Sequence, residues 1–190
     1  GDRSTGECVL VDPAYAVSEL VELVGRDGMT VSGVLATHHH PDHVGGSMMG
    51  HSIEGIAELL EVVDVPVHVH RDETEWVTKT TAVDVDHLVG HHSGDVVTVG
   101  GVEIRLVHTP GHTPGSQCFF VDDRLVAGDT LFLEGCGRTD LPGSDPTKMA
   151  ESLRRLAEVP DSTILFPGHR YSFASSATMD VVKETNVVFQ

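Results

Sequence analysis

The chain has 190 residues, of which 39% are hydrophobic, and its 29 acidic and 12 basic residues leave a formal net charge of −17. This size and hydrophobic content predict one domain with its own core, spanning residues 1–190. So few Lys and Arg exclude a nucleic-acid-binding surface and docking on anionic membranes, because both need clustered positive charge. Three cysteines without a C-x-x-C pair predict a reducing, cytoplasmic location. No signal peptide or membrane-length apolar run is visible, although the chain opens on Gly1 rather than Met.

The first half of the chain alternates predicted strands and helices. Asp12-Pro13 closes the first strand and Gly25 ends the first helix, while β-branched runs mark the later strands. In order, we expect a strand at Glu7–Val11, a helix at Ala14–Val24, a strand at Val31–Thr37, a helix with apolar positions from Ile53 to Val63, and a strand at Pro66–His70.

The second half begins with hairpins. Gly100-Gly101 and Asp122-Asp123 each separate two apolar, β-branched runs, as turns of β-hairpins do. Asp145-Pro146 is typical of a helix start. We expect strands at Val96–Val99 and Val102–Val107, strands at Gln117–Val121 and Arg124–Ala127, a helix from Asp145 to Leu156 and a strand at Thr163–Phe166. Two groups of strands with helices between them predict an α/β domain with two sheets and helices outside.

The stretch from Thr37 to Gly46, THHHPDHVGG, is the densest group of metal-ligand side chains. Imidazole is the commonest protein metal ligand near neutral pH, and carboxylate often accompanies it. Packing so many such groups together without a cation would leave polar atoms to be paired at considerable cost. The run therefore predicts a metal site.

The spacing H-x-H-x-D-H divides these side chains into two sets. Residues two apart on an extended segment point the same way, so His38 and His40 can face one ion while His39 faces away. Asp42 and His43 follow one turn later, where the chain enters a helix, and can face a neighbouring ion. A catalytic zinc needs three protein ligands with one position open, so further donors are required.

Three more candidates each follow a predicted strand in a Gly-containing turn. They are His112 in TPGHTPG, Asp129 in AGDT and His169 in FPGH. Ligands at strand ends can converge on one site. Most isolated histidines are structural or solvated, and we assign that role to His51, His68, His70, His87 and His108. We expect His91 and His92 to be a solvated pair in a polar loop rather than a metal site.

The ordered set THxHxDH, PGHTPG, GDTLF and PGH resembles the metallo-β-lactamase superfamily, over most of the chain from Asp12 to His169. The resemblance implies a four-layer αβ/βα sandwich with two mixed sheets and helices outside. It implies two divalent metal ions, zinc in first place and iron or manganese as alternatives. It implies that His38, His40 and His112 bind one ion, that Asp42, His43 and His169 bind the second, and that Asp129 bridges them.

Within the superfamily, the segment from Gly128 to Asp140, GDTLFLEGCGRTD, is similar to hydroxyacylglutathione hydrolases (glyoxalase II) and persulfide dioxygenases. Against that family the first strand is missing, and too few residues follow His169 for the helical thiol-binding domain. In the tail, Glu184 and Asn186 match the family pattern but Val187 replaces a proline. The family's glutathione-binding residues therefore do not carry over, and Arg138 is the one basic residue that its pattern places near the site.

The first hypothesis is a metallo-hydrolase of the glyoxalase II type, in which a metal-bridging hydroxide attacks a thioester carbonyl. Asp42 would orient the hydroxide or carry its proton, and Arg138 would attract a carboxylate or the tail of a thiol conjugate. The alternative is a persulfide dioxygenase with one iron on His38, His112 and Asp129, a two-His, one-carboxylate set. A non-catalytic metal-binding domain is a third hypothesis, which the complete ligand set disfavours. All three predict a small-molecule or metal partner, and none predicts the oligomeric state.

Overall fold

The computed structural model describes residues 1–190 and shows two compact units. The first comprises Gly1–His91 together with Val97–Glu103, and the second comprises His92–Val96 together with Ile104–Gln190. No helix in the structure combines the length and the apolar character needed to cross a membrane. Each unit has a sheet and a hydrophobic core of its own.

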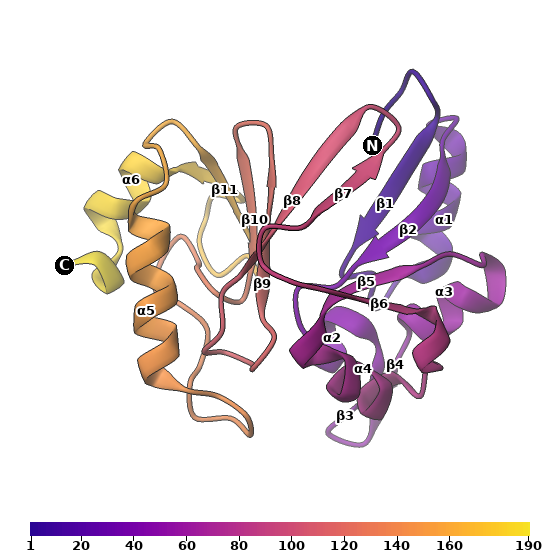
Figure 1. The fold of residues 1–190 in the computed structure, drawn as a ribbon, viewed down its shortest axis with the longest axis horizontal. Coiled ribbons are helices and arrows are strands. Elements are labelled where there is room, and N and C mark those ends of the chain that lie inside the picture. Colours follow the sequence, from indigo (N-terminus) through magenta and orange to yellow (C-terminus); the bar gives the residue numbers. More distant parts are fainter. The chain divides into compact units, whose positions relative to one another are not determined.

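The sheet of the first unit is built from four parallel strands in the order β1-β2-β5-β6. Helices α1 and α3 lie along it (Figure 1), and their apolar side chains share a core with Val34, Val67 and Val69, which are fully buried. The central strands β2 and β5 are largely buried, whereas β1 and β6 are more exposed. The elements are β1 (Glu7–Val11), α1 (Val17–Arg26), β2 (Thr30–Leu35), α3 (Ile56–Val62), β5 (Val67–His70) and β6 (Leu88–His91).

Short elements follow the histidine run and replace part of the expected helix. Ile53 ends a strand, and the helix begins only at Ile56, because Gly45 and Gly55 bring two backbone segments together. A Cβ on Gly45 would lie 2.5 Å from the Cα of Gly55, and Gly45 has a φ of +85°. The elements are α2 (Pro41–Val44), β3 (Gly46–Met48), β4 (His51–Ile53), the 3₁₀ turns at Arg71–Glu73 and Val85–His87, and α4 (Thr74–Thr81).

The second sheet is mixed, in the order β12-β11-β10-β9-β8-β7. Strands β10 and β11 are parallel, whereas the β8/β9, β9/β10 and β11/β12 pairs are antiparallel. Helices α5 and α6 flank this sheet in Figure 1, and both contribute to its core. The elements are β7 (Val96–Val99), β8 (Val102–His108), β9 (Gln117–Val121), β10 (Arg124–Gly128), α5 (Pro146–Ala157), β11 (Ile164–Pro167), β12 (Ala177–Thr178), α6 (Met179–Thr185) and a 3₁₀ turn at Val187–Phe189.

Most expected elements are confirmed, with boundaries that match or differ by at most three residues. The predicted cap of α5 is present, because Asp145 Oδ1 accepts hydrogen bonds from the backbone N–H groups of Thr147 (2.8 Å) and Lys148 (3.1 Å). The expected pair of mixed sheets holds for the second unit, whereas the first sheet is parallel throughout. The patterns did not indicate α4, α6, β6 or β12, which are short elements with weak periodicity.

Candidate metal centre

The histidine run lies where β2 ends and α2 begins. His40 is the N-cap residue of α2 in an extended conformation, and Pro41 opens the helix. His40 is extended and Pro41–Val44 is helical, so Asp42 and His43 lie on a helix whereas His38 and His40 precede it. His38 and His43 are almost fully buried, with exposed fractions of 1% and 3%.

Asp12, directly after β1, organises this run. Its Oδ1 accepts the backbone N–H of Thr37 (2.7 Å), and its Oδ2 accepts the Thr37 hydroxyl (2.6 Å) and His43 Nδ1 (2.8 Å). Parallel pairing of β1 with β2 places the two strand ends side by side. One carboxylate therefore fixes both the backbone and a side chain of the run. We assign it an orienting role rather than that of a metal ligand.

These bonds set the tautomers of two histidines. A carboxylate only accepts, so His43 carries its proton on Nδ1. The Thr37 hydroxyl already donates to Asp12, so its bond with His38 Nδ1 (3.0 Å) makes that nitrogen the donor. Both rings are therefore left with a lone pair on Nε2, as a histidine oriented for a metal requires.

The other residues of the run complete the first half of the candidate centre. The ring centroid of His38 lies 4.8 Å from that of His40 and 4.1 Å from that of His43. His43 Nε2 is 3.9 Å from Asp42 Oδ2. The sequence-predicted donors of this segment are thus gathered locally.

His39 faces away from these donors, as predicted. Its backbone N–H donates to Glu73 Oε1 (2.9 Å), its Nδ1 bonds to the same oxygen, and its ring stacks on Trp76. Glu73 is 1% exposed, so this is a buried pair that attaches the run to α4. His39 is a structural anchor.

In the second unit, two predicted histidine donors lie beside one carboxylate oxygen of the third predicted donor, Asp129. Asp129 Oδ2 lies 3.7 Å from His112 Nε2 and 3.4 Å from His169 Nε2. His112 Nδ1 bonds to the carbonyl oxygen of Arg138 (2.8 Å), which only accepts, so its lone pair is also on Nε2. A central carboxylate between two imidazoles is an arrangement suited to bridging two ions.

Glycines and one buried amide support this second half. A Cβ on Gly137 would lie 2.0 Å from the carbonyl oxygen of Asp129, and one on Gly168 would lie 2.4 Å from its Oδ1. The Asn186 side chain, 1% exposed, bonds to Phe132 O (3.0 Å) and to Gly135 N (2.9 Å) and O (3.1 Å). The loop after Asp129 is therefore closely packed on the donors and held from the C-terminal helix region.

The loop that carries His112 is attached to α5 and the turn before it. Ser144 Oγ donates to His112 O (2.8 Å), and Ser152 Oγ donates to Pro110 O (2.8 Å). Gly111, with a φ of +141°, packs so closely that a Cβ would lie 2.4 Å from Met149 backbone atoms. His112 is therefore positioned by contacts with residues more than 30 positions away.

The sequence placed Arg138 at the substrate side of the centre. Its side chain is 68% exposed, and its guanidinium bonds to both carboxylate oxygens of Asp140 at 2.9 Å. This pairing raises the pKa of Arg138.

Two other side chains lie next to Arg138 or His169 in the sequence or in space. Burial raises the pKa of the Cys136 thiol, so that thiol stays protonated. Tyr171 stacks on His169, with ring centroids 5.1 Å apart.

Two histidines expected to be structural or solvated form a pair of their own in the first unit. His68 Nδ1 lies 2.9 Å from His91 Nε2, between neighbouring strands β5 and β6. Burial, and secondarily the neighbouring His91, lowers the pKa of His68 to about 4. His91 thus ends a strand and pairs with His68, rather than lying in a polar loop with His92 as expected.

Sequence interpretation missed three supporting residues, namely Asp12, Glu73 and Asn186. A signal existed for Asp12, which belongs to an Asp-Pro pair directly after β1. Because β1 pairs with β2, the strand before the histidine run, Asp12 lies near the run. Glu73 lies in a segment without a marked pattern, and the resemblance marked Asn186 in the tail without indicating which groups it contacts. The donor types nevertheless fit divalent metals, since three imidazoles present Nε2 lone pairs and the carboxylates of Asp42 and Asp129 lie beside imidazole Nε2 atoms.

A family model described as the metallo-beta-lactamase superfamily matches residues 3–169. The chain belongs to this superfamily. Among curated relatives, the hydroxyacylglutathione hydrolase of Xanthomonas campestris is 34% identical over 185 residues, covering 97% of this chain and 65% of that enzyme. A probable polyketide biosynthesis zinc-dependent hydrolase of Bacillus velezensis is 29% identical, covering 100% of this chain and 79% of the relative.

The fold also matches solved structures. The crystal structure of ETHE1 from Myxococcus xanthus superimposes with a TM-score of 0.80 at 29% identity, covering 96% of this chain and 74% of that one. The chain thus has the metallo-β-lactamase fold and lies near the branch that its GDTLFLEGCGRTD segment indicated. It spans just under two thirds of the Xanthomonas enzyme.

Proposed function

We propose that this chain is a metal-dependent thioester hydrolase of the glyoxalase II type. The observation that carries the proposal is the common tautomer of the donors, because His38, His43 and His112 each have Nδ1 bonded to a protein acceptor, which places the lone pair on Nε2. Structural histidines need no such common orientation. The hydrolase names of two relatives support the reaction class.

The proposed centre would hold two divalent ions. We assign zinc as the first choice, in line with the zinc-dependent name of the Bacillus relative. Two such ions would lower the pKa of a water between them towards neutrality and polarise an acyl carbonyl. In this proposal His38, His40 and His112 would hold one ion, Asp42, His43 and His169 would hold the other, and Asp129 would contribute to both.

The chain's own groups then have distinct roles. Asp42 is the only candidate donor of its run that is a carboxylate, so it can accept a hydrogen bond from the attacking water as well as bind a metal. Asp12 keeps His43 in the required tautomer. Arg138 stands in exposed pairing with Asp140, where it can exchange that partner for an anionic group of the substrate. The substrate class is a thioester or thiol conjugate.

A persulfide dioxygenase with one iron is the second candidate. It would use His38, His112 and Asp129, the donor type of non-haem Fe(II) sites. The likeness to the Myxococcus ETHE1 structure favours this branch over more distant superfamily members. The two candidates differ in whether Asp42, His43 and His169 hold a metal.

Metal analysis of the protein purified from its own source separates the candidates. About two zinc ions per chain with thioester cleavage supports the hydrolase, whereas about one iron with oxygen uptake on a persulfide supports the dioxygenase. His169→Ala should remove the second ion and reduce thioester cleavage by more than roughly 100-fold, beyond the usual effect of losing an orienting partner. His51→Ala, an exposed histidine of β4, is the matched control. A mild effect of His169→Ala would count against the dinuclear hydrolase.

A further inference from the structure

The basic side chains of this acidic protein are unevenly partnered. Seven of the 12 form ion pairs with carboxylates. Of the remainder, Arg170 donates to a backbone carbonyl. The other four form no ion pair, and all line hollows on one side of the second unit. They are Arg105, Lys148, Arg154 and Arg155.

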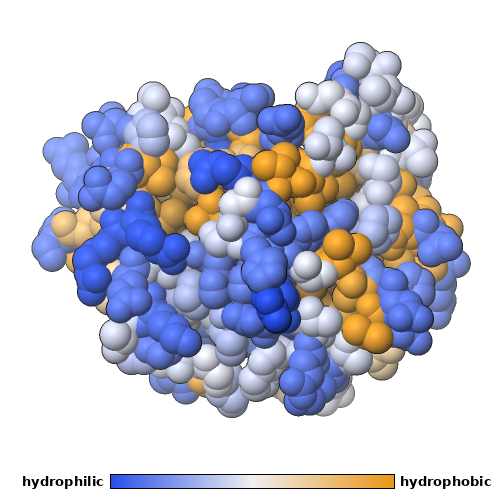
Figure 2. All heavy atoms as spheres, viewed as in Figure 1, coloured by the Kyte–Doolittle hydropathy of each residue, from blue (hydrophilic) through white to orange (hydrophobic).

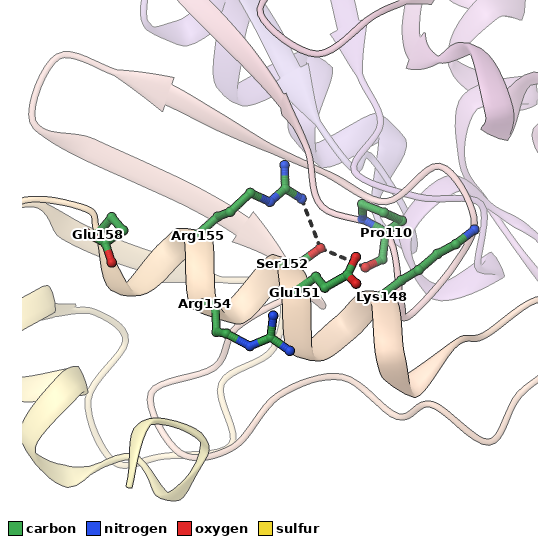
Figure 3. Close-up of a pocket in the computed structure, with 7 residues that line it drawn as sticks. All are labelled: Pro110, Lys148, Glu151, Ser152, Arg154, Arg155 and Glu158. Atoms are coloured by element: carbon green, nitrogen blue, oxygen red, sulfur yellow. Dashed lines mark hydrogen bonds between the residues drawn. The ribbon is translucent and has the colours of Figure 1, made fainter.

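The hollows adjoin one another along α5. One has a volume of about 420 Å³ and the other of about 260 Å³, and Arg155 and Glu158 lie in the walls of both. Figure 3 shows Lys148, Arg154 and Arg155 extending from α5 in different directions, with Ser152 between them. The surface over α5 is predominantly hydrophilic (Figure 2). We call the two hollows together the α5 groove.

The second hollow supplies an apolar end. Arg105 Cζ lies 4.4 Å from the ring centroid of Phe120, so this cation is held over an aromatic face. The rest of the wall is largely apolar. It includes Val107, Leu156, Val159 and Pro160. The α5 groove therefore runs from a charged end to an apolar end.

Arg155 stands at the junction with its guanidinium already fixed. Its Nη2 donates to His108 O (2.9 Å) and to Ser152 Oγ (3.2 Å), and Ser152 is itself buried and bonded to Pro110. The Nε and Nη1 donors remain for another acceptor. A guanidinium held in place loses little further freedom when it binds an anion, which favours binding.

Intrahelical pairing does not neutralise this charge. Glu151 is three positions before Arg154 and Glu158 is four positions after it, spacings that normally allow ion pairs on a helix surface. Neither glutamate forms an ion pair with any of the four cations. In a chain of net charge −17, four cations left over in one groove indicate complementarity to an external anion.

We propose that the α5 groove binds a small organic anion, with a carboxylate or phosphate head at Arg155 and an apolar body towards Phe120. Carboxylate and phosphate share the acceptor geometry that guanidinium recognises. The site is separate from the donors of the candidate metal centre and does not depend on the hydrolase proposal. Because Arg155 and Ser152 hold the backbone that leads to His112, an occupant would also contact the support of that ligand loop.

Titration calorimetry on the full chain tests the groove with octanoate, octyl phosphate, octanol and inorganic phosphate as probes. We expect at least one octyl anion to bind about tenfold or more tightly than octanol and inorganic phosphate, because head and body each contribute. Preference between the two octyl anions identifies the head group. Binding of octanol as tight as that of both anions would overturn the proposal.

Variants locate the binding. Arg105→Gln and Arg155→Gln should each weaken binding of the octyl anion roughly tenfold, the usual order for one charged contact. Arg124→Gln, which removes an exposed cation of the same unit that pairs with Asp123, should leave binding unchanged. Amide NMR shifts on adding the octyl anion should centre on α5 and β9 in all variants that fold. Equal affinity of all three variants, or shifts centred on His112 and His169, would refute the α5 groove.

Discussion

The two halves of the candidate centre are built in different ways. The first is one continuous segment, from His38 to His43, in which the carboxylate of Asp12 fixes Thr37 at its start and orients His43 at its end. The second is dispersed over residues 112–169 and gathers around Asp129. Its geometry comes from loop packing, close glycines and a remote amide. A local half thus depends on one orienting residue, and a dispersed half depends on the fold around it.

The largest expected effect comes from the orienting residue of the local half. Asp12→Asn keeps the shape of the side chain and one acceptor oxygen. When the amide nitrogen faces His43, however, it cannot accept the hydrogen bond from Nδ1. We expect metal affinity, measured by chelator competition, to fall 10–100-fold, with little loss of stability. Asp64→Asn, at an exposed position, is the control. Unchanged metal affinity in Asp12→Asn would mean that the local half does not need this carboxylate.

For the dispersed half, the main effect that we expect from removing a supporting side chain is a loss of folding stability. Asn186→Ala removes the partners of Phe132 O, Gly135 N and O, and Val188 N in a buried position. We expect the free energy of unfolding in urea to fall by about 2 kcal/mol, the cost of leaving buried polar groups unbonded. Gln190→Ala, whose side chain makes one exposed bond, should change it little. A loss of metal affinity without loss of stability would reverse the assignment of roles to the two halves.

The same contrast explains how far the sequence could be interpreted. The donors His38, His40, Asp42 and His43 could be proposed because they are contiguous, and the outward direction of His39 followed from strand alternation. His112, Asp129 and His169 were found through their turns and through resemblance to a family. The contacts of Glu73 and Asn186 could not be predicted, because they depend on long-range packing, even though the tail that contains Asn186 resembles the family pattern. Ile53 was placed in a helix because apolar spacing does not register the close approach of Gly45 and Gly55.

The smallest expected effect concerns histidines of the first unit that lie outside the run. The pKa of His68 is lowered to about 4 by burial and by His91, whereas an unfolded chain has the ordinary value near 6.5. The unfolded state therefore binds more protons between these values, so the stability contributed by neutral His68 is complete above pH 6.5 and is lost as the pH falls towards 4. Because His68 is partly solvated, we expect the wild type to lose about 1 kcal/mol more than His68→Gln between pH 7 and pH 5. Urea unfolding at both pH values measures this, with the exposed His51→Gln as control. Equal losses of unfolding free energy in the wild type and His68→Gln would show that burial of His68 does not make folding dependent on pH. The pH dependence would then have to come from other histidines, such as those of the run.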